Sequence, residues 1–311
     1  MRWKKLGQII TPEKVNRDWM VTHAMDPTVD HLTDDIFRFY FCGRNDQNQS
    51  LIGYADIDLN DPDKIIRTPR EPSLGLGALG AFDDNGVTAS CIVDNDGAKF
   101  LYYIGWKPRS TTRFGLMTGL AISEDGGNSF SRYSRAPILS LTDREPYWIL
   151  TAPFVLKDDS EWKMWYVSCE GWIHADLPTY NIKLALSHDG VNWEQTGQVC
   201  LDFKDKNETA LARPCVLKEN GVYRMWLSYK THTQTYRIGY AESKNGVDWH
   251  RMDHLAGINV SSDGWDSEMI EYPYVFTHGK KKYMAFNGNG YGENGAGLAI
   301  LDQDSADTGS K

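Results

Sequence analysis

The sequence predicts an all-β fold, a single five-bladed β-propeller whose last blade is closed by the N-terminal strand. Three observations predict it. A pattern of short strands repeats along the 311 residues, and the copies recur at an interval of about 60 residues. The final copy also lacks a fourth strand, and the N-terminus supplies a matching segment.

The repeated pattern is a strand beginning at or just after a proline, an aromatic-rich second strand, a third strand and a tight turn, although the second copy lacks the proline and the fifth lacks the turn. Ala152-Pro-Phe-Val-Leu in the third copy matches Arg213-Pro-Cys-Val-Leu in the fourth. Alternating apolar and polar residues in the third strands, followed by Asp-Gly or Asn-Gly, favour strands over helices. Residues ending the second strands lie about 60 positions apart, as four strands per blade require: Arg44, Trp106, Glu170, Lys230 and Asn289.

The ends of the chain predict how the ring closes. The fifth copy stops after its third strand, and Met1-Arg-Trp3-Lys-Lys-Leu-Gly-Gln-Ile resembles the segment from Val191 to Val199. An outer strand from the N-terminus would join the first and last blades and leave no open edge. We expect a propeller over 1–301, with blades at about 25–75, 87–140, 151–202, 212–260 and 271–301 plus 1–10, and a disordered polar tail over 302–311.

Composition excludes several classes of function. Asp and Glu number 42 against 33 Lys and Arg, giving a formal net charge of −9, so a nucleic acid partner is not expected. No apolar run approaches the roughly 20 residues that cross a bilayer, and no apolar region of a signal peptide follows Met1. We expect a cytoplasmic protein with no membrane partner, and the sequence leaves its oligomeric state open.

The five cysteines form an odd set without C-x-x-C spacing and lie mostly inside apolar runs: Cys42, Cys91, Cys169, Cys200 and Cys215. This pattern favours reduced core thiols over disulfides or a metal site. We expect no cofactor and assign no metal ligands.

The order of the strands predicts two different faces. The turns at Ser123–Phe130, Ser187–Trp193 and Ser243–Trp249 share one face, where Asx side chains close turns and Trp packs between blades. The other face holds the inner-strand starts and the loops between second and third strands, which predicts a polar, aromatic-walled funnel. Its candidate residues are His23, Asp26, Arg44, Asp83, Asp84, Trp106, Ala152, Glu170, Trp172, His174, Arg213, Lys230, Glu268, Glu271, Tyr272, Asn289 and Tyr291.

Asp26-Pro at the first inner strand, then Gly80-Ala-Phe-Asp83-Asp84 before the second blade, resembles the five-bladed propellers of glycoside hydrolase families 43, 32, 68, 117 and 130. The resemblance covers residues 1–301. It is greatest to a branch without signal peptides associated with bacterial surface-glycan biosynthesis, on Phe82-Asp-Asp, Tyr102-Tyr-Ile-Gly-Trp106, Ala212-Arg-Pro and Gly264-Trp-Asp-Ser-Glu-Met-Ile-Glu-Tyr-Pro273. It implies a carbohydrate ligand and a general base or nucleophile at Asp26.

Glycoside hydrolysis needs two carboxyl groups, a proton donor and a base or nucleophile. Family 43 enzymes carry acidic residues near the inner strands of blades three and four, where this chain has Ala152 and Arg213, so the partner of Asp26 is open. Glu170 is one candidate, because burial beside Cys169 would raise its pKa. Other acids near the funnel are candidates for catalysis (Asp84, Glu268) or for sugar binding (Asp83, Glu271).

The remaining funnel residues suggest ligand contacts. Arg44, Arg213 and Lys230 either bind an anionic group on the ligand or neutralise the nearby acids. Other polar and aromatic residues are candidates for hydroxyl contacts and for stacking on sugar faces: His23, His174, Asn289, Trp106, Trp172 and Tyr291.

Three functions fit these observations. The first is an intracellular glycoside hydrolase or transglycosidase acting on a small anionic or activated sugar, such as a sugar nucleotide. The second is a phosphorylase that uses inorganic phosphate at the cationic residues. The third is a non-catalytic carbohydrate-binding propeller in surface-glycan biosynthesis. The fold alone does not choose among these three functions.

Overall fold

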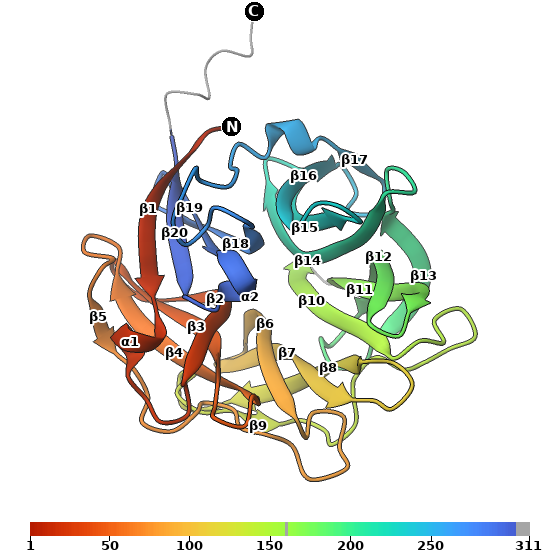
Figure 1. Ribbon diagram of the computed structural model, residues 1–311, viewed down its shortest axis with the longest axis horizontal. Helices are drawn as coiled ribbons and strands as arrows, with labels where there is room; N and C mark the ends of the chain where they lie inside the picture. Colours follow the sequence, from red (N-terminus) through yellow and green to blue (C-terminus); the bar gives the residue numbers. More distant parts are fainter. Residues whose placement is uncertain (159–160, 303–311) are drawn as a thin grey trace, which may run out of the picture.

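The computed structural model describes residues 1–158 and 161–302 (Figure 1). The all-β prediction is confirmed, because strands form nearly all of the regular structure. Within the described residues the helices are single turns: α1 (Pro12–Val15), α2 (Asn289–Gly292) and the 3-10 helix η1 (Asp253–Leu255). The predicted tail, apart from Asp302, lies outside the described residues.

The described strands pair antiparallel in successive groups of four. The first group is β2 (Thr22–Thr33), β3 (Ile36–Arg44), β4 (Ser50–Asp58) and β5 (Ile65–Arg67), and the second is β6 (Gly86–Asn95), β7 (Ala98–Pro108), β8 (Phe114–Ser123) and β9 (Ser131–Arg132). The third is β10 (Ile149–Asp158), β11 (Glu161–His174), β12 (Leu177–Ser187) and β13 (Glu194–Leu201), and the fourth is β14 (Glu208–Glu219), β15 (Val222–Thr231), β16 (Arg237–Ser243) and β17 (Trp249–Arg251).

The last group joins the two ends of the chain. It comprises β18 (Glu271–His278), β19 (Lys281–Asn287), β20 (Ala296–Leu301) and, from the N-terminus, β1 (Trp3–Ile10). Trp3 lies opposite Leu301, and its indole N–H donates to the Ala256 carbonyl at 2.9 Å. The N-terminal strand therefore covers the outer edge of β20 and fastens to the loop after the fourth group.

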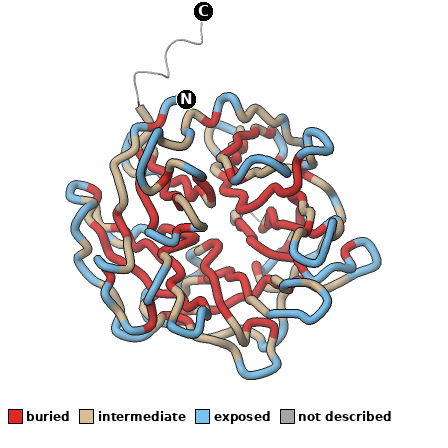
Figure 2. Tube along the Cα trace, viewed as in Figure 1, coloured by how far each residue is buried: buried red, intermediate tan, exposed pale blue. Residues whose placement is uncertain are grey.

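The first strand of each group lies at the centre of the molecule (Figure 1). These inner strands contact one another in order, β2 with β6, β6 with β10, β10 with β14, β14 with β18, and β18 with β2. Figure 2 shows that the central strands are buried while the connecting loops are exposed. The core therefore surrounds the central axis.

The inner strands carry bulges at the X-Pro positions. Asp26, Ala152, Arg213 and Tyr272 all have positive φ, between 47° and 58°, and the strand pairing shifts register at each of them. The sequence prediction that strands begin at or just after these prolines is wrong, because each strand begins one to five residues before the left-handed residue. A left-handed residue with a Cβ is strained, and bulges redirect side chains.

The cysteine and turn predictions are confirmed. All five thiols, within the described ranges, are free and buried, and Cys91 and Cys215 link inner strands by accepting the N–H groups of Val155 and Val275. On the turn face, the Asp189 carboxylate accepts the N–H groups of Val191 and Asn192 at 2.8 Å each. These side chains hold the scaffold rather than face the inner-strand bulges.

Candidate active site

Arg213 joins three inner strands across the axis. From its bulge in β14, its Nε lies 3.3 Å from Oδ1 of Asp26 in β2, and its Nη1 donates to the Ala89 carbonyl in β6 at 2.6 Å. Asp26 and Arg213 are both buried. The prediction that these residues approach a common axis is therefore consistent with their geometry, and Arg213 neutralises Asp26.

Asp26 is held from two sides. Its backbone N–H donates to Oδ1 of Asn287 in β19 at 3.0 Å. Burial raises the pKa of the Asp26 carboxyl, while the positive charges of Arg213 and Arg44 oppose the rise. Burial and the two arginines therefore act on the Asp26 pKa in opposite directions, and perturbed pKa values of this kind are frequent at catalytic sites.

A second buried carboxyl, Glu271, lies at the start of β18. It is fully buried, and neither carboxyl oxygen makes a hydrogen bond of good geometry with a described residue, although the Asn287 amide lies opposite it in the strand pairing. Burial, and next the negative charge of Asp26, raise the pKa of Glu271 well above its usual value, with Lys230 and Arg213 opposing. Asp26 and Glu271 therefore interact electrostatically.

Lys230 and a group of tyrosines complete this side of the axis. Lys230 Nζ lies 5.1 Å from the centre of the Tyr236 ring, and burial lowers the Lys230 pKa while Glu271 opposes. The hydroxyl groups of Tyr180 and Tyr236 lie 2.6 Å apart. The Tyr236 ring also lies 5.6 Å from that of Tyr272. We call Asp26, Arg213, Lys230, Glu271, Asn287 and these three tyrosines the axial site.

A cationic edge adjoins the axial site. Burial lowers the Arg44 pKa, Asp26 raises it, and the neighbouring Arg113 lowers it further. Burial and then Arg44 lower the pKa of His23 to about 4. Among the described residues, no carboxylate pairs with Arg44, Arg113 or Lys230. Asp26 and Glu293 act on Arg44 electrostatically without forming an ion pair with it. We call Arg44 and Arg113, which have no direct ion pair among the described residues, the cationic edge.

An aromatic wall lies on the other side. The Phe114 ring lies 5.4 Å from Trp106 and 5.7 Å from Trp172. These three half-buried side chains pack against the buried cluster that contains Ala152. The Trp106 indole N–H donates to the Thr88 hydroxyl at 3.2 Å. Flat, half-buried rings suit contact with the apolar face of a sugar.

The expectation that Glu170 is buried is wrong. Glu170 is exposed and pairs with Lys183 at 2.9 Å, whereas the neighbouring Cys169 is buried in the cluster that contains Ala152. The pairing of β11 with β12 shifts register between Cys169 and Gly171, and Glu170 is the extra residue at this bulge. Glu170 therefore points away from the cluster to which Cys169 belongs.

The two aspartates before the second group are both bound by protein partners. Asp83 is buried, and its Oδ2 accepts from Arg132 at 2.7 Å and from the Tyr103 hydroxyl at 2.9 Å. Asp84 accepts from Lys107 at 2.7 Å; burial alone would raise its pKa, but Lys107 and the Gly80 N–H lower it overall. These contacts give both residues structural roles in fixing the loop.

Three further predicted residues lie outside the axial site. Glu268 and His174 are exposed. Asn289 is not at a strand end, because β19 ends at Asn287, and its Oδ1 accepts the Glu268 N–H at 2.8 Å within the neighbouring loop. The spacing of about 60 residues between copies therefore selected a position two residues beyond the end of β19. Asn287 is the residue that ends this strand. Tyr291 lies 6.3 Å from the Tyr236 ring.

Sequence reasoning did not select Tyr180, Tyr236 or Arg113. A signal for the tyrosines was present, since Tyr180 and Tyr236 each stand seven residues before the serine of the following turn, Ser187 and Ser243. Arg113 lies in a loop without a repeat counterpart, and only folding brings it close to Arg44.

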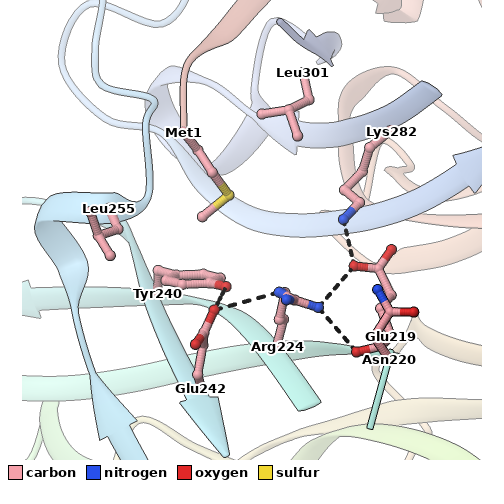
Figure 3. A pocket seen from close by; sticks show the side chains of 9 residues that line it. All are labelled: Met1, Glu219, Asn220, Arg224, Tyr240, Glu242, Leu255, Lys282 and Leu301. Carbon is pink, nitrogen blue, oxygen red and sulfur yellow. Dashed lines mark hydrogen bonds and ion pairs between the residues drawn. The ribbon is translucent and has the colours of Figure 1, made fainter. Parts of the chain in front are cut away.

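A separate depression of about 650 Å³ lies where β20 and the N-terminus meet the fourth group (Figure 3). Its charges are paired with one another: Arg224 Nη1 lies 3.2 Å from Glu219 and Lys282 Nζ lies 2.7 Å from the same carboxylate. This internal pairing contrasts with the unpaired cationic edge.

No group of three or more His, Cys, Asp or Glu side chains is arranged to hold a metal ion in the parts of the chain that the structure describes. In those same parts, every helix is too short to cross a membrane.

The fold is that of propeller glycoside hydrolases. A structure of BT0996 in a complex with RGII is 19% identical, covers 96% of this chain and 91% of its own, and has a TM-score of 0.76. A glycosyl hydrolase from Bacteroides ovatus is 12% identical over 97% of this chain and 93% of its own, with a TM-score of 0.73. A thermostable family-43 glycoside hydrolase is 14% identical over 90% and 89%, with a TM-score of 0.67.

Sequence comparison gives a nearer relationship. No protein-family model matches the chain. Two Mycobacterium tuberculosis proteins, "Uncharacterized protein MT1551" and "Uncharacterized protein Rv1502", are each 42% identical over 303 residues, which are 97% of this chain and all of theirs. The chain therefore belongs to the family of these two mycobacterial proteins.

Proposed function

We propose that this protein is a glycoside hydrolase or transglycosidase that acts on a small anionic sugar, with Asp26 as the carboxylate directed at the anomeric carbon. The observation that carries the proposal is the buried Asp26–Arg213 pair at the axis of a fold shared with glycoside hydrolases. One of those neighbours is described in complex with RGII, which supports a carbohydrate ligand.

The chemistry follows from the surroundings of Asp26. The left-handed bulge fixes its backbone, and the Asn287 side-chain oxygen accepts its N–H. Burial raises the Asp26 pKa, and Arg213 and Arg44 oppose that rise by favouring the ionised form. An ionised Asp26 attacks the anomeric carbon or removes a proton from the attacking water, and it stabilises the oxocarbenium-like transition state. The configuration of the product, read by proton NMR, distinguishes these two routes.

The anionic character of the substrate rests on the cationic edge. Arg44 and Arg113 repel each other in a partly buried setting, and an anion between them would relieve that repulsion. Arginine binds carboxylate and phosphate through paired N–H groups. A sugar carboxylate or phosphate at this edge would place the anomeric carbon by a strong contact remote from the reacting bond.

The same cations favour a second candidate, a glycoside phosphorylase. Inorganic phosphate beside Arg44 and Arg113 would then replace water as the nucleophile. Cleavage that requires added phosphate and yields a sugar phosphate would select this function over hydrolysis.

The wider setting is also proposed. We interpret the five strand groups as five blades, with β1 completing the last. A cytoplasmic role in surface-glycan biosynthesis, on a sugar nucleotide or another activated sugar, follows from the sequence resemblance. A non-catalytic binding propeller is the outcome if ligands stabilise the protein without being consumed.

The experiment that tests the proposal is a thermal-shift screen of sugars, sugar phosphates and nucleotide sugars, followed by mass spectrometry of each stabilising ligand. A ligand at 100 times its Kd adds about 2.7 kcal/mol of stability. We expect an anionic sugar to stabilise the wild type and to be consumed, and Asp26→Asn to bind it with far slower turnover. Stabilisation only by neutral sugars would contradict the proposal.

A further inference from the structure

We propose that Glu271 is the proton donor of the axial site, the second carboxyl group that cleavage with Asp26 requires. The inference rests on the function proposed above and assigns a role that sequence reasoning gave to Glu170, Asp84 or Glu268. Those three are exposed or bound to cations, whereas Glu271 is buried beside Asp26.

The environment of Glu271 is that of a neutral acid. The residue has no exposed surface, and its two oxygens make no hydrogen bond of good geometry with the described residues. An ionised carboxylate in this position would lose its hydration, and the charges of Lys230 and Arg213 offset only part of that cost. The protonated form avoids that cost and holds the proton that a general acid needs.

Glu271 and Asp26 both contact Asn287, one through strand pairing and the other through a hydrogen bond. Glu271 stands opposite Asn287 in the β18–β19 pairing, and Oδ1 of Asn287 accepts the Asp26 N–H at 3.0 Å. The next residue, Tyr272, is the left-handed bulge of β18, and its N–H donates to the Ser228 hydroxyl at 2.7 Å. The inner strand and Asn287 together fix the two carboxyl groups relative to each other.

Groups from every neighbouring element act on the Glu271 proton. The negative charge of ionised Asp26 on β2 favours a protonated Glu271. Lys230 on β15 and Arg213 on β14 favour the ionised form, and Lys230 stabilises the carboxylate once the proton has left. The other titratable neighbours are tyrosines that stay neutral at pH 7: Tyr180, Tyr236, Tyr272 and Tyr291.

Because Glu271 is fully buried, protonation of a leaving group requires a neighbouring segment to move, and α2 is adjacent to it. Tyr291 is the exposed member of the tyrosine group, 42% exposed, and its carbonyl accepts from Asn287 Nδ2 at 3.3 Å. Gly290, Tyr291 and Gly292 all have positive φ. Glycines permit this segment to change conformation at small cost, and its displacement would open Glu271 to a leaving group.

The proposed step balances. The bond between the anomeric carbon and the leaving oxygen breaks, its electron pair stays on the oxygen, and that oxygen takes the proton of Glu271. In the water-mediated route, Asp26 removes a proton from water as the water oxygen bonds to the anomeric carbon. That proton then returns through solvent from Asp26 to the Glu271 carboxylate, which restores both groups.

Infrared spectroscopy tests the protonation without a substrate. Protein labelled with 13C at glutamate carboxyl groups, studied at pH 7, should show the carbonyl band of a protonated acid. The band should be absent from Glu271→Gln and kept in Glu124→Gln, a matched exposed glutamate on the turn face. A wild type without this band overturns the inference even if Glu271→Gln fails to fold.

Leaving-group dependence tests the role in catalysis. With Glu271→Gln we expect a small loss on 4-nitrophenyl glycosides, whose leaving group needs no proton, and a loss of about 10²–10⁴-fold on methyl glycosides. Asp26→Asn should lose both activities. Equal losses on both substrates in Glu271→Gln overturn the inference but leave the proposed function intact, whereas a wild type that cleaves neither overturns the proposed function and the inference with it.

Discussion

The two sides of the axis are built from the same repeat but differ in chemistry. The charged side comes from the first, fourth and fifth groups and carries Asp26, Arg213 and Glu271. The aromatic side comes from the second and third groups, where Ala152 replaces a charged bulge residue and belongs to the buried cluster against which Trp106 and Trp172 pack. If the proposed function holds, bond cleavage belongs to the charged side and sugar stacking to the aromatic side.

The largest expected effect comes from Asp26→Asn. The substitution removes the charge and keeps the shape, so turnover should fall by about 10²–10⁴-fold while ligand affinity changes little. Steady-state kinetics and a thermal melt of the variant check this. A folded variant with wild-type turnover would remove Asp26 from the chemistry and leave the charged side a structural feature.

Arg44→Met should weaken binding of anionic sugars by about 10–100-fold, because charge-assisted hydrogen bonds contribute roughly 1.5–3 kcal/mol. Affinity for the neutral counterpart of the same sugar should stay unchanged. Calorimetry with both ligands measures the difference. An equal loss of affinity for the two ligands would show that Arg44 positions Asp26 and does not bind the anionic group.

Trp172→Ala probes the aromatic side. Loss of one stacking ring should weaken binding about 5–10-fold, since such contacts contribute roughly 1 kcal/mol. The effect should appear in KM for neutral and anionic sugars alike, with kcat nearly unchanged. A loss of kcat with KM unchanged would instead show that Trp172 acts in the bond-cleavage step rather than in sugar binding.

His23 gives a pH-dependent prediction. Its pKa in the folded protein is about 4, against 6.5 in the unfolded chain, so the unfolded state binds the proton first as the pH falls. The protein should therefore lose stability between pH 6.5 and 4, and His23→Asn, which tolerates positive φ, should lose less. Melting curves across this range measure the difference, and parallel curves for the two proteins would contradict the assignment.

The smallest effect on activity should come from the turn face. Asp189→Ala removes the acceptor of the Val191 and Asn192 N–H groups and should cost about 1–2 kcal/mol of stability. Turnover should stay at the wild-type value. Denaturant unfolding and kinetics together check this, and a fall in activity without a fall in stability would link this face to the site.

The sequence predicted the fold class well because the strand signals are local and repeated. Alternation, Asp-Gly or Asn-Gly turns and X-Pro positions each recur in several copies, so Asp26 and Arg213 were selected by position alone. Glu170 was selected for its neighbours in sequence, but it is the extra residue at a bulge of β11 and points away from the cluster that contains Cys169.

The parts that sequence reasoning missed depend on distant segments. The isolation of Glu271 results from β2, β14 and β15 enclosing the start of β18, and no pattern within β18 reports it. The sequence prediction placed the end of β19 at Asn289 instead of Asn287, because the spacing between copies varies by a few residues. Arg113 meets Arg44 only when the second group lies beside the first.

The central claim is that the axial site cleaves anionic sugars through Asp26. The most direct measurement compares wild type and Asp26→Asn on paired 4-nitrophenyl glycosides, each uronic acid against its neutral hexose, with and without phosphate. The account predicts nitrophenol release from at least one uronide by the wild type, slower release from its neutral pair, and release about 10²–10⁴-fold slower by Asp26→Asn. Faster release from the neutral member of every pair, or equal release by Asp26→Asn, would contradict it.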